Sequence, residues 1–342
     1  MNTRHLSVGL VLLPRFNMMT LTSVIEPMRI ANYLAPEKLF SWEYRADQNG
    51  RVYASNGMDI DCAQINATKD PHFDIIAVFG SWGAENYENS TLLSWLHLQS
   101  RKGTLLIGVE LGVFALARAG LLSDKKVTTH WSCKQGLVES FPKVEVCEQL
   151  YTMDGNIMSC AGAAAGLDMM LEIISKYHGE QLVGEISNQI LHHHRRAATT
   201  PQRHALGSMA RDIHPNVREA MQLLEANIEE PLTIPELCKS LKVSQRSLER
   251  LFVRDTGCTI VQFSKLLRLQ YARVLLTSTS MSVREVSVAC GFNSLSYFSQ
   301  CFSAVFFKRP SEYRQAWPDN EPAPSWPGTA YTFAKETRAE QM

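Results

Sequence analysis

The chain has 342 residues, which is long enough for two domains that each bury a core of their own. Its 34 basic and 34 acidic side chains cancel, so the net charge identifies neither a polyanionic nor a cationic partner. No apolar run reaches the roughly 20 residues of a membrane helix, which excludes a protein that crosses a membrane by helices.

The first residues carry an ambiguous apolar run. Arg4 followed by Leu6–Leu13 imitates a signal peptide, but Arg15 interrupts the pattern and no small-residue cleavage site follows. The eight cysteines show no CxxC pair and no metal-binding spacing, which favours buried thiols in a reducing compartment. We therefore expect a cytoplasmic protein without a metal or another cofactor.

The N-terminal half alternates between apolar strands and helices, which predicts an α/β domain with a doubly wound parallel sheet. Ligands of such sheets bind beyond the carboxyl ends of the strands, here Pro14–Met19, Gly80–Trp82 and Glu110. The expected strands are Leu6–Leu13, Phe40–Arg45, Phe73–Phe79 and Thr104–Val109. The expected helices are Thr20–Leu34 (interrupted by Pro27), Leu92–Gln99, the segment after Gly112 through Ala119, Ala161–Ile174 and Gly179–Arg196.

Three motifs in this half are distinctive. They are Glu26-Pro27-x-Arg29-x-Ala31-Asn32, Gly108-x-Glu110-x-Gly112 with its following helix, and Thr128-Thr129-His130-Trp131. With them, residues 6–176 resemble the PfpI-type, glutamine-amidotransferase-like fold. Its catalytic members place a cysteine nucleophile on a sharp strand-to-helix turn, and that position is Glu110 here. A carboxylate cannot replace the thiolate in acyl transfer, so we expect a binding pocket, and an amidase or protease remains the alternative.

The expected pocket suits a cationic or zwitterionic amine, because carboxylates and aromatic faces both attract such a group. The resemblance implies that Glu26 and His130 converge on Glu110, and that relatives sense arginine, glycine betaine or carnitine. Alternatively, Glu110 only caps its helix and the tryptophans belong to the core. The predicted ligand-binding residues are Phe16, Glu26, Trp82, Glu110, His130 and Trp131.

A polar stretch separates this half from the next. The run His192–Arg196 could suggest a metal, but consecutive residues point to different helix faces, so we expect a structural or solvated role. We expect a ligand-sensing domain at residues 1–196, a linker at 197–212, a DNA-binding domain at 213–317 and a disordered tail at 318–342.

The C-terminal half contains two helix–turn–helix patterns. In the first, Thr233 and Glu236 form a capping-box pattern, and Ser244 caps a second helix with an exposed arginine row. In the second, Ser282 and Glu285 repeat the box. Gly291 makes the turn, and Ser294 caps a helix whose apolar stripe faces inward. The long helical pattern Thr259–Ser278 between them would fix the spacing of two helices in successive major grooves, about 34 Å apart.

Such patterns also occur in plain packed helix pairs, and an arginine row is usually a solvated face. The presence of two copies of the pattern and the local positive charge favour DNA binding, because residues 214–314 carry 13 basic and 9 acidic side chains. Arg and Gln on the second helix of each copy suit guanine and adenine edges. The predicted DNA-binding residues are Ser244, Gln245, Arg246, Arg250, Ser294, Ser296, Tyr297, Ser299 and Gln300.

Residues 213–314 resemble the AraC/XylS family of bacterial transcription regulators. The motifs are Ser244-x-Arg246-x-Leu248-x-Arg250-x-Phe252, Ala289-Cys290-Gly291-Phe292, Ser296-Tyr297-Phe298-Ser299 and Pro310-Ser311-x-Tyr313-Arg314. Lys242 and Phe307 stand where this family favours Gly, so these helix ends could close differently. The resemblance implies an activator that binds promoter DNA as a homodimer, contacts RNA polymerase and responds to an amine. A constitutive DNA-binding protein with a structural N-terminal domain is a further alternative.

Overall fold

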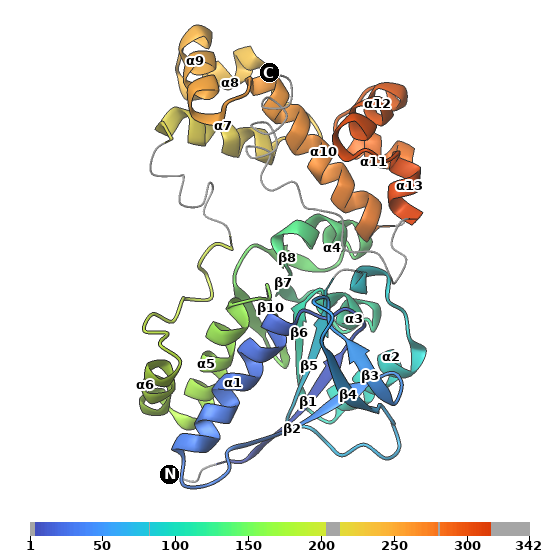
Figure 1. The fold of residues 1–342 in the computed structure, drawn as a ribbon, viewed down its shortest axis with the longest axis vertical. Helices are drawn as coiled ribbons and strands as arrows, with labels where there is room; N and C mark the ends of the chain where they lie inside the picture. Colours follow the sequence, from blue (N-terminus) through green and yellow to red (C-terminus); the bar gives the residue numbers. More distant parts are fainter. Residues whose placement is uncertain (1–3, 82, 203–212, 280, 316–342) are drawn as a thin grey trace. The chain divides into compact units, whose positions relative to one another are not determined.

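The computed structural model describes residues 4–81, 83–202, 213–279 and 281–315 (Figure 1). The chain divides into two compact units, with the boundary along the chain between Gln202 and Arg203. Residues 197–202, predicted as linker, belong to the first unit: the Leu150 amide donates to the Ala198 carbonyl at 3.0 Å, and Gln149 pairs with Pro201. The rest of the predicted linker and the predicted tail lie outside the described residues.

The N-terminal unit alternates strands and helices along the chain. Its strands are β1 Leu6–Leu12, β2 Phe40–Ala46, β3 Gly50–Tyr53, β4 Asp59–Gln64, β5 Ile75–Gly80, β6 Leu105–Glu110, β7 Lys126–Thr128, β8 Glu145–Cys147, β9 Tyr151–Asp154 and β10 Ile157–Cys160. Its helices are α1 Met18–Leu34, η1 Ala84–Asn86, α2 Ser90–Arg101, α3 Val113–Arg118, η2 Trp131–Cys133, α4 Lys134–Ser140, α5 Ala165–His178 and α6 Glu180–Gln189.

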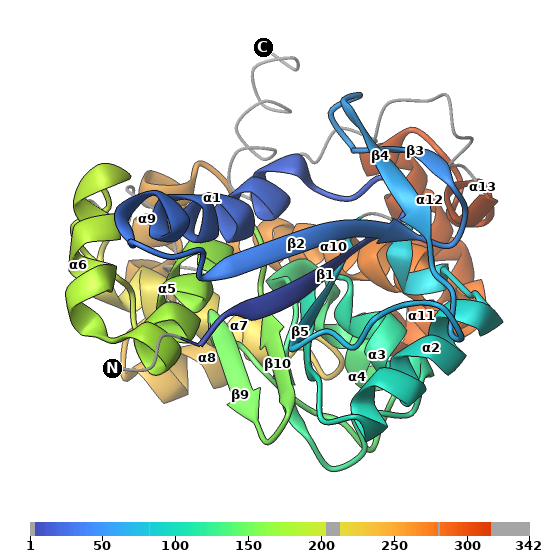
Figure 2. The same ribbon diagram turned by 90° about the horizontal axis from the view of Figure 1, so that it is seen from below.

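The main sheet has the order β3-β4-β2-β1-β5-β6-β10-β9, and its six central strands are parallel. Alternate residues of β5 face opposite sides: Ile75 and Phe79 pack with α1, α5 and α6, whereas Ile76 and Val78 pack with α2 and α3. Figure 2 shows these two helix groups on opposite faces of the sheet. The predicted doubly wound α/β class is confirmed.

Several predicted bounds were wrong. Helix α1 continues through Pro27 without interruption. Helix α6 ends at Gln189, so the run His192–Arg196 is not helical. The short strands β3, β4 and β7 to β10 escaped prediction because three to six residues with mixed polarity carry little periodic signal.

The C-terminal unit is helical throughout the described residues. Both predicted capping boxes are present, because the Thr233 amide donates to Glu236 Oε2 at 2.8 Å and the Ser282 amide donates to Glu285 Oε2 at 2.6 Å. Its helices are α7 Pro215–Ala226, α8 Ile234–Leu241, α9 Gln245–Thr256, α10 Ile260–Ser278, α11 Val283–Ala289, α12 Leu295–Phe306 and α13 Pro310–Gln315.

Helix α10 joins the two helix–turn–helix motifs and belongs to both of their cores (Figure 1). Its first half buries Phe263 and Leu266 with α7, α8 and α9, and its second half buries Leu269 and Leu275 with α11 to α13. At 1.5 Å per residue its 19 residues span about 28 Å, close to one turn of B-DNA.

The second motif is also joined directly to the first. Arg268 of α10 donates to the carbonyl oxygens of Cys290 and Gly291 at 2.7 and 2.6 Å. Its guanidinium lies 4.1 Å from the ring centroid of Phe292. A Cβ on Gly291 would lie 2.7 Å from the Glu229 carbonyl oxygen, in the loop before α8. Only glycine fits this junction, which fixes the relative position of the motifs.

Lys242 and Phe307 end α8 and α12 in the left-handed conformation, with φ of 53° and 56°. Both helices thus end in the conformation that glycine would adopt, but the Cβ atoms of Lys242 and Phe307 strain the backbone there. The equivalent end of α9 is Gly257, with φ of 75° and open space around the position of a Cβ. The second helices of the two motifs therefore provide a matched pair of helix ends, Gly257 after α9 and Phe307 after α12.

Replacing Phe307 by Gly should raise the free energy of unfolding by about 1 kcal/mol, because the strain disappears and the lost side chain is 85% exposed. Gly257→Ala should lower it by a similar amount. Chemical denaturation of the full chain, followed by the helical signal of the C-terminal unit, measures both. A destabilised Phe307→Gly protein would show that the ring makes a stabilising contact instead.

Candidate ligand site and DNA interface

Strand β6 ends in a sharp turn at Glu110. Glu110 has φ of 57°, although it is not glycine. A Cβ on Gly108 would lie 2.6 Å from Val113 Cα, and a Cβ on Gly112 would overlap the Val78 carbonyl oxygen. The spacing Gly108-x-Glu110-x-Gly112 thus lets α3 pack closely on the sheet and presents the Glu110 side chain at the strand end, as in nucleophile elbows.

The carboxylate of Glu110 is held by hydroxyl groups from neighbouring strand ends. Thr20 Oγ1, at the start of α1, donates to Oε2 at 2.9 Å, and Ser81 Oγ, after β5, donates to Oε1 at 3.0 Å. The Asn17 side chain bonds it as well. The predicted convergence of the segments after β1, β5 and β6 agrees with these contacts.

Glu110 is only 7% exposed, and this burial raises its pKa to about 7 although its three hydrogen bonds oppose the shift. The group therefore changes charge near neutral pH. A carboxylate offers about four acceptor positions, so three donors leave room for one more. Such a group can accept a hydrogen bond or an ion pair from a cation.

Two of the predicted ligand residues follow, in the chain, a residue that contacts the backbone of the elbow. Thr129 Oγ1 donates to the Glu110 carbonyl at 2.9 Å, which places the following residues, His130 and Trp131, next to the elbow. Their rings are 5.3 Å apart, and His130 Nδ1 lies 2.7 Å from Ser132 Oγ. Trp131 is half-buried.

The structure does not bring Glu26 to this centre. Glu26 was wrongly expected to converge on Glu110: its carboxylate is 47% exposed and pairs with Arg29 at 2.7 Å. Six residues after Thr20, it faces another side of α1. Phe16 is fully buried and packs in the core of the sheet domain. Trp82 lies outside the described residues.

Sequence reasoning placed Asn17 and Ser81 in the segments around the crevice and Thr129 in a motif, but it named neither these three nor Thr20 as residues that hold Glu110. Small polar residues are common at strand ends and helix caps, so their type alone does not mark them as partners of Glu110. Asn17 indeed also caps α1, accepting from the Met19 amide at 3.0 Å. Their position after adjacent parallel strands was the available signal.

The nearest thiol does not offer a nucleophile. Cys160, at the end of β10, is fully buried, accepts from the Gly162 amide at 3.4 Å, and has its pKa raised by burial to about 12. Such a thiol stays protonated at neutral pH, whereas nucleophilic attack needs the thiolate.

The histidine run has a structural partner. Asp168 of α5, completely buried, accepts from His192 Nε2 at 3.0 Å, from the Arg196 amide at 2.8 Å and from the Arg196 guanidinium at 2.6 Å. These contacts tie the segment after α6 to the sheet domain. Within the described ranges, no three His, Cys, Asp or Glu side chains are placed to hold a metal ion.

In the first motif, the second helix α9 exposes the predicted arginine row. Arg246 and Arg250 are exposed, and no ion pair of theirs is found among the described residues. Arg254 pairs instead with Asp255, whose other oxygen accepts from the His214 amide at 2.8 Å. Gln245 donates to Glu249 at 2.9 Å. Two free guanidinium groups are therefore available on this face.

In the second motif, α12 presents small polar side chains. Ser296, Tyr297 and Gln300 are exposed, and Ser299 is half-buried. Ser294 caps the helix by accepting from the Tyr297 amide at 3.3 Å, and Ser244 caps α9 in the same way. The opposite face buries Phe298 and Phe302 completely, so the outer face is left for a partner.

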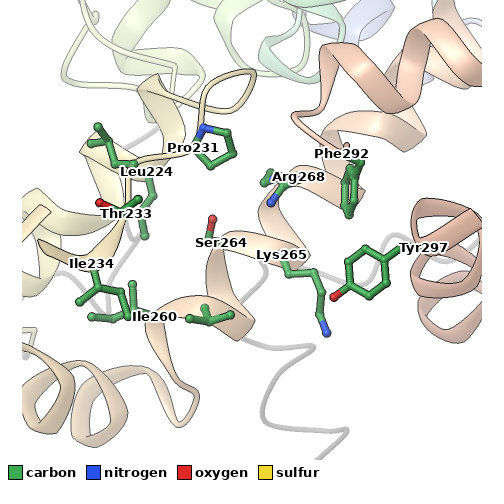
Figure 3. A pocket seen from close by; sticks show the side chains of 12 residues that line it. Leu224, Pro231, Thr233, Ile234, Ile260, Ser264, Lys265, Arg268, Phe292 and Tyr297 are labelled. Atoms are coloured by element: carbon green, nitrogen blue, oxygen red, sulfur yellow. The ribbon is translucent and has the colours of Figure 1, made fainter. Parts of the chain in front are cut away.

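A cleft of about 230 Å³ lies between the two motifs (Figure 3). The start of α8 borders it on one side and the start of α12 on the other, and Figure 3 shows Phe292 and Tyr297 facing Lys265 and Arg268 of α10. No acidic residue lines it. In helix–turn–helix proteins the first helix crosses the DNA backbone and the second enters the groove, and the cleft lies at the start of one helix of each kind.

None of the described helices is long and apolar enough to cross a membrane.

Comparisons with known proteins find a matching family for each of the two units. Residues 11–176 match the DJ-1/PfpI family, and residues 237–316 match a helix-turn-helix domain family. The chain is 36% identical over 323 residues to the HTH-type transcriptional regulator GbdR of Pseudomonas aeruginosa, covering 94% of this chain and 87% of that protein. It is 34% identical over 319 residues to CdhR of the same species, another HTH-type transcriptional regulator, covering 93% and 94%.

A crystal structure of an AraC family transcriptional regulator from Pseudomonas putida shares the fold of about half the chain. Its TM-score is 0.51 at 22% identity, and the match covers 54% of this chain and 99% of that one. Together, the helix-turn-helix match, the DJ-1/PfpI match and the full-length similarity show that the chain belongs to the AraC family of DNA-binding transcriptional regulators, in the group with an N-terminal DJ-1/PfpI domain.

Proposed function

We propose that the N-terminal unit binds a small cationic or zwitterionic amine, and that this ligand controls promoter binding by the C-terminal unit. The observation that carries the proposal is the buried Glu110 carboxylate at the elbow, with a pKa of about 7 and one acceptor position left. An amine next to Glu110 offsets the cost of burying its negative charge.

An enzymatic role has less support. The elbow position carries Glu110, and the neighbouring Cys160 is held as a thiol by burial. We infer that the DJ-1/PfpI fold serves here as a binding domain. We also propose that the regulator works in the cytoplasm as a homodimer, contacts RNA polymerase and acts as an activator, as the AraC family resemblance implies.

On DNA, we propose that Arg246, Arg250, Ser296 and Gln300 read base edges in two successive major grooves, and that Lys265 contacts the intervening phosphate strand. The free guanidinium groups support the first assignment. The acid-free cleft supports the second, because phosphates attract an unpaired ammonium.

Arg246→Ala should weaken operator binding by about 1–3 kcal/mol and relax preference at one base position. Lys265→Ala should instead weaken binding to every sequence similarly and reduce the slope of log K against log salt by about one. Binding titrations at several salt concentrations, on an operator and on its single-base variants, separate the two. Arg254→Ala is the control, because Asp255 already holds that arginine. Unchanged base preference in both Arg246→Ala and Gln300→Ala would remove the assignment of the recognition helices.

Binding of an amine should depend on pH through Glu110. The cation favours the deprotonated carboxylate, so affinity should rise up to tenfold per unit as pH increases toward about 7 and level off above it. Titrations of arginine, glycine betaine, carnitine and choline between pH 5.5 and 8.5 measure this, with a thermal shift as a first screen. Glu110→Gln should abolish the dependence, and Glu26→Gln, at an exposed position, should keep it. An uncharged or anionic best ligand would contradict the proposal.

The same carboxyl should affect stability. Because the folded pKa lies above the unfolded value of 4.5, the protonated form is favoured in the folded state. Stability should fall as pH rises from about 4.5 to 7, by roughly 3 kcal/mol for this group. Glu85, with its pKa also raised to about 7 by burial, contributes a second fall. The melting-temperature difference between Glu110→Gln and the parent, followed over this range, isolates Glu110. A constant difference would mean that Glu110 does not titrate there.

A further inference from the structure

The last described residue of the N-terminal unit, Gln202, is bonded through both ends of its amide. Nε2 lies 2.9 Å from Thr128 Oγ1, 2.8 Å from the Thr129 carbonyl and 3.0 Å from the Gln149 carbonyl. Oε1 accepts from the Trp131 amide at 2.8 Å. Two amide hydrogens thus serve three acceptors, and this side chain is fully engaged.

Two hydrogen bonds in series connect Gln202 to the backbone of Glu110. Gln202 donates to the Thr129 carbonyl, and Thr129 Oγ1 donates to the Glu110 carbonyl at 2.9 Å. The same amide fixes the Trp131 backbone, and so the segment that places His130 and Trp131 beside the elbow. The strained backbone of Glu110 is therefore supported by a segment that Gln202 holds in place.

Gln202 also stands at a special place in the chain. It is the final residue of the first compact unit, directly before the connection to the DNA-binding unit. Three contacts hold the segment that leads to it. The Arg196 amide donates to Asp168, the Ala198 carbonyl accepts from the Leu150 amide, and Pro201 pairs with Gln149. A side chain at the exit of the domain, rather than one inside the sheet, therefore holds the Thr129–Trp131 segment.

We propose that Gln202 is a positioning residue of the ligand site that links amine binding to the start of the interdomain connection. The inference rests on the proposed ligand site at Glu110. A ligand that moves or fixes the Thr129–Trp131 segment must change the bonds that Gln202 makes. By reciprocity, a change at Gln202 must change the affinity for the ligand.

The test uses the full-length protein. The variant Gln202→Glu keeps the size of the side chain, but it replaces the amide NH₂ group that donates to three acceptors by a carboxylate oxygen. Thr129→Val, which keeps the branched shape and removes the bond to Glu110, is the second variant. Gln64→Glu is the control, because the exposed Gln64 side chain donates 3.0 Å to the Asp47 carbonyl at the end of β4 and contacts none of the groups that Gln202 holds. Three quantities are measured: ligand Kd, operator Kd with and without saturating ligand, and hydrogen exchange at the Trp131 amide.

We expect Gln202→Glu and Thr129→Val each to weaken amine binding at least tenfold and to move the ratio of operator affinities with and without ligand toward one. Operator affinity without ligand should stay within about twofold, and Gln64→Glu should behave as the parent. Exchange at the Trp131 amide should accelerate in Gln202→Glu. A merely structural role would destabilise the unit but leave the ratio unchanged.

The failures are distinguishable. If the parent binds no amine, the proposed ligand is wrong, and the link between the two residues is tested by hydrogen exchange alone. Introducing Glu110→Gln into the parent should then alter exchange at the Trp131 amide, whereas introducing it into the Gln202→Glu variant should not. If the parent binds an amine and both variants retain its affinity and the operator ratio, the role of Gln202 is wrong while the ligand site stands.

Discussion

The N-terminal unit depends on the left-handed backbone of Glu110, where a charged side chain is buried at the end of a central strand. Such strain persists only where the surroundings determine it fully. Here Gly108 and Gly112 permit the close approach of α3, and the Thr129 hydroxyl holds the carbonyl. The turn that presents a nucleophile in enzymes of this architecture thus presents a titratable acceptor, on which the proposed ligand site rests.

The DNA-binding unit depends on a different constraint, the spacing of its two motifs. Helix α10 contributes one half of its apolar residues to each core, while Arg268 joins it to the turn of the second motif. The recognition helices themselves differ in chemistry, because α9 offers free guanidinium groups and α12 offers hydroxyl and amide groups. A rigid spacing matters for such an unequal pair, since each helix can read its groove only in the register that α10 sets.

The sequence was sufficient where a local rule acts alone. Capping boxes at Thr233 and Ser282 marked helix starts, and the resemblance carried by Gly108-x-Glu110-x-Gly112 placed the elbow at Glu110. It failed where tertiary partners decide. Glu26 was expected at the site because the family resemblance implied it, but the carboxylate pairs with Arg29 on another face of α1. The Asp168 anchor joins residues 24 or more positions apart, and Gln202 bonds to residues more than 50 positions away, which no local pattern reveals.

The shared core of α10 also bears on how the C-terminal unit unfolds. Opening of either motif exposes half of the apolar side chains of a helix that the other motif packs against. Gly291, pressed against the loop before α8, adds a second contact that both motifs lose together. Two motifs that look like separate modules in the chain therefore form one cooperative folding unit, in which neither opens without weakening its neighbour.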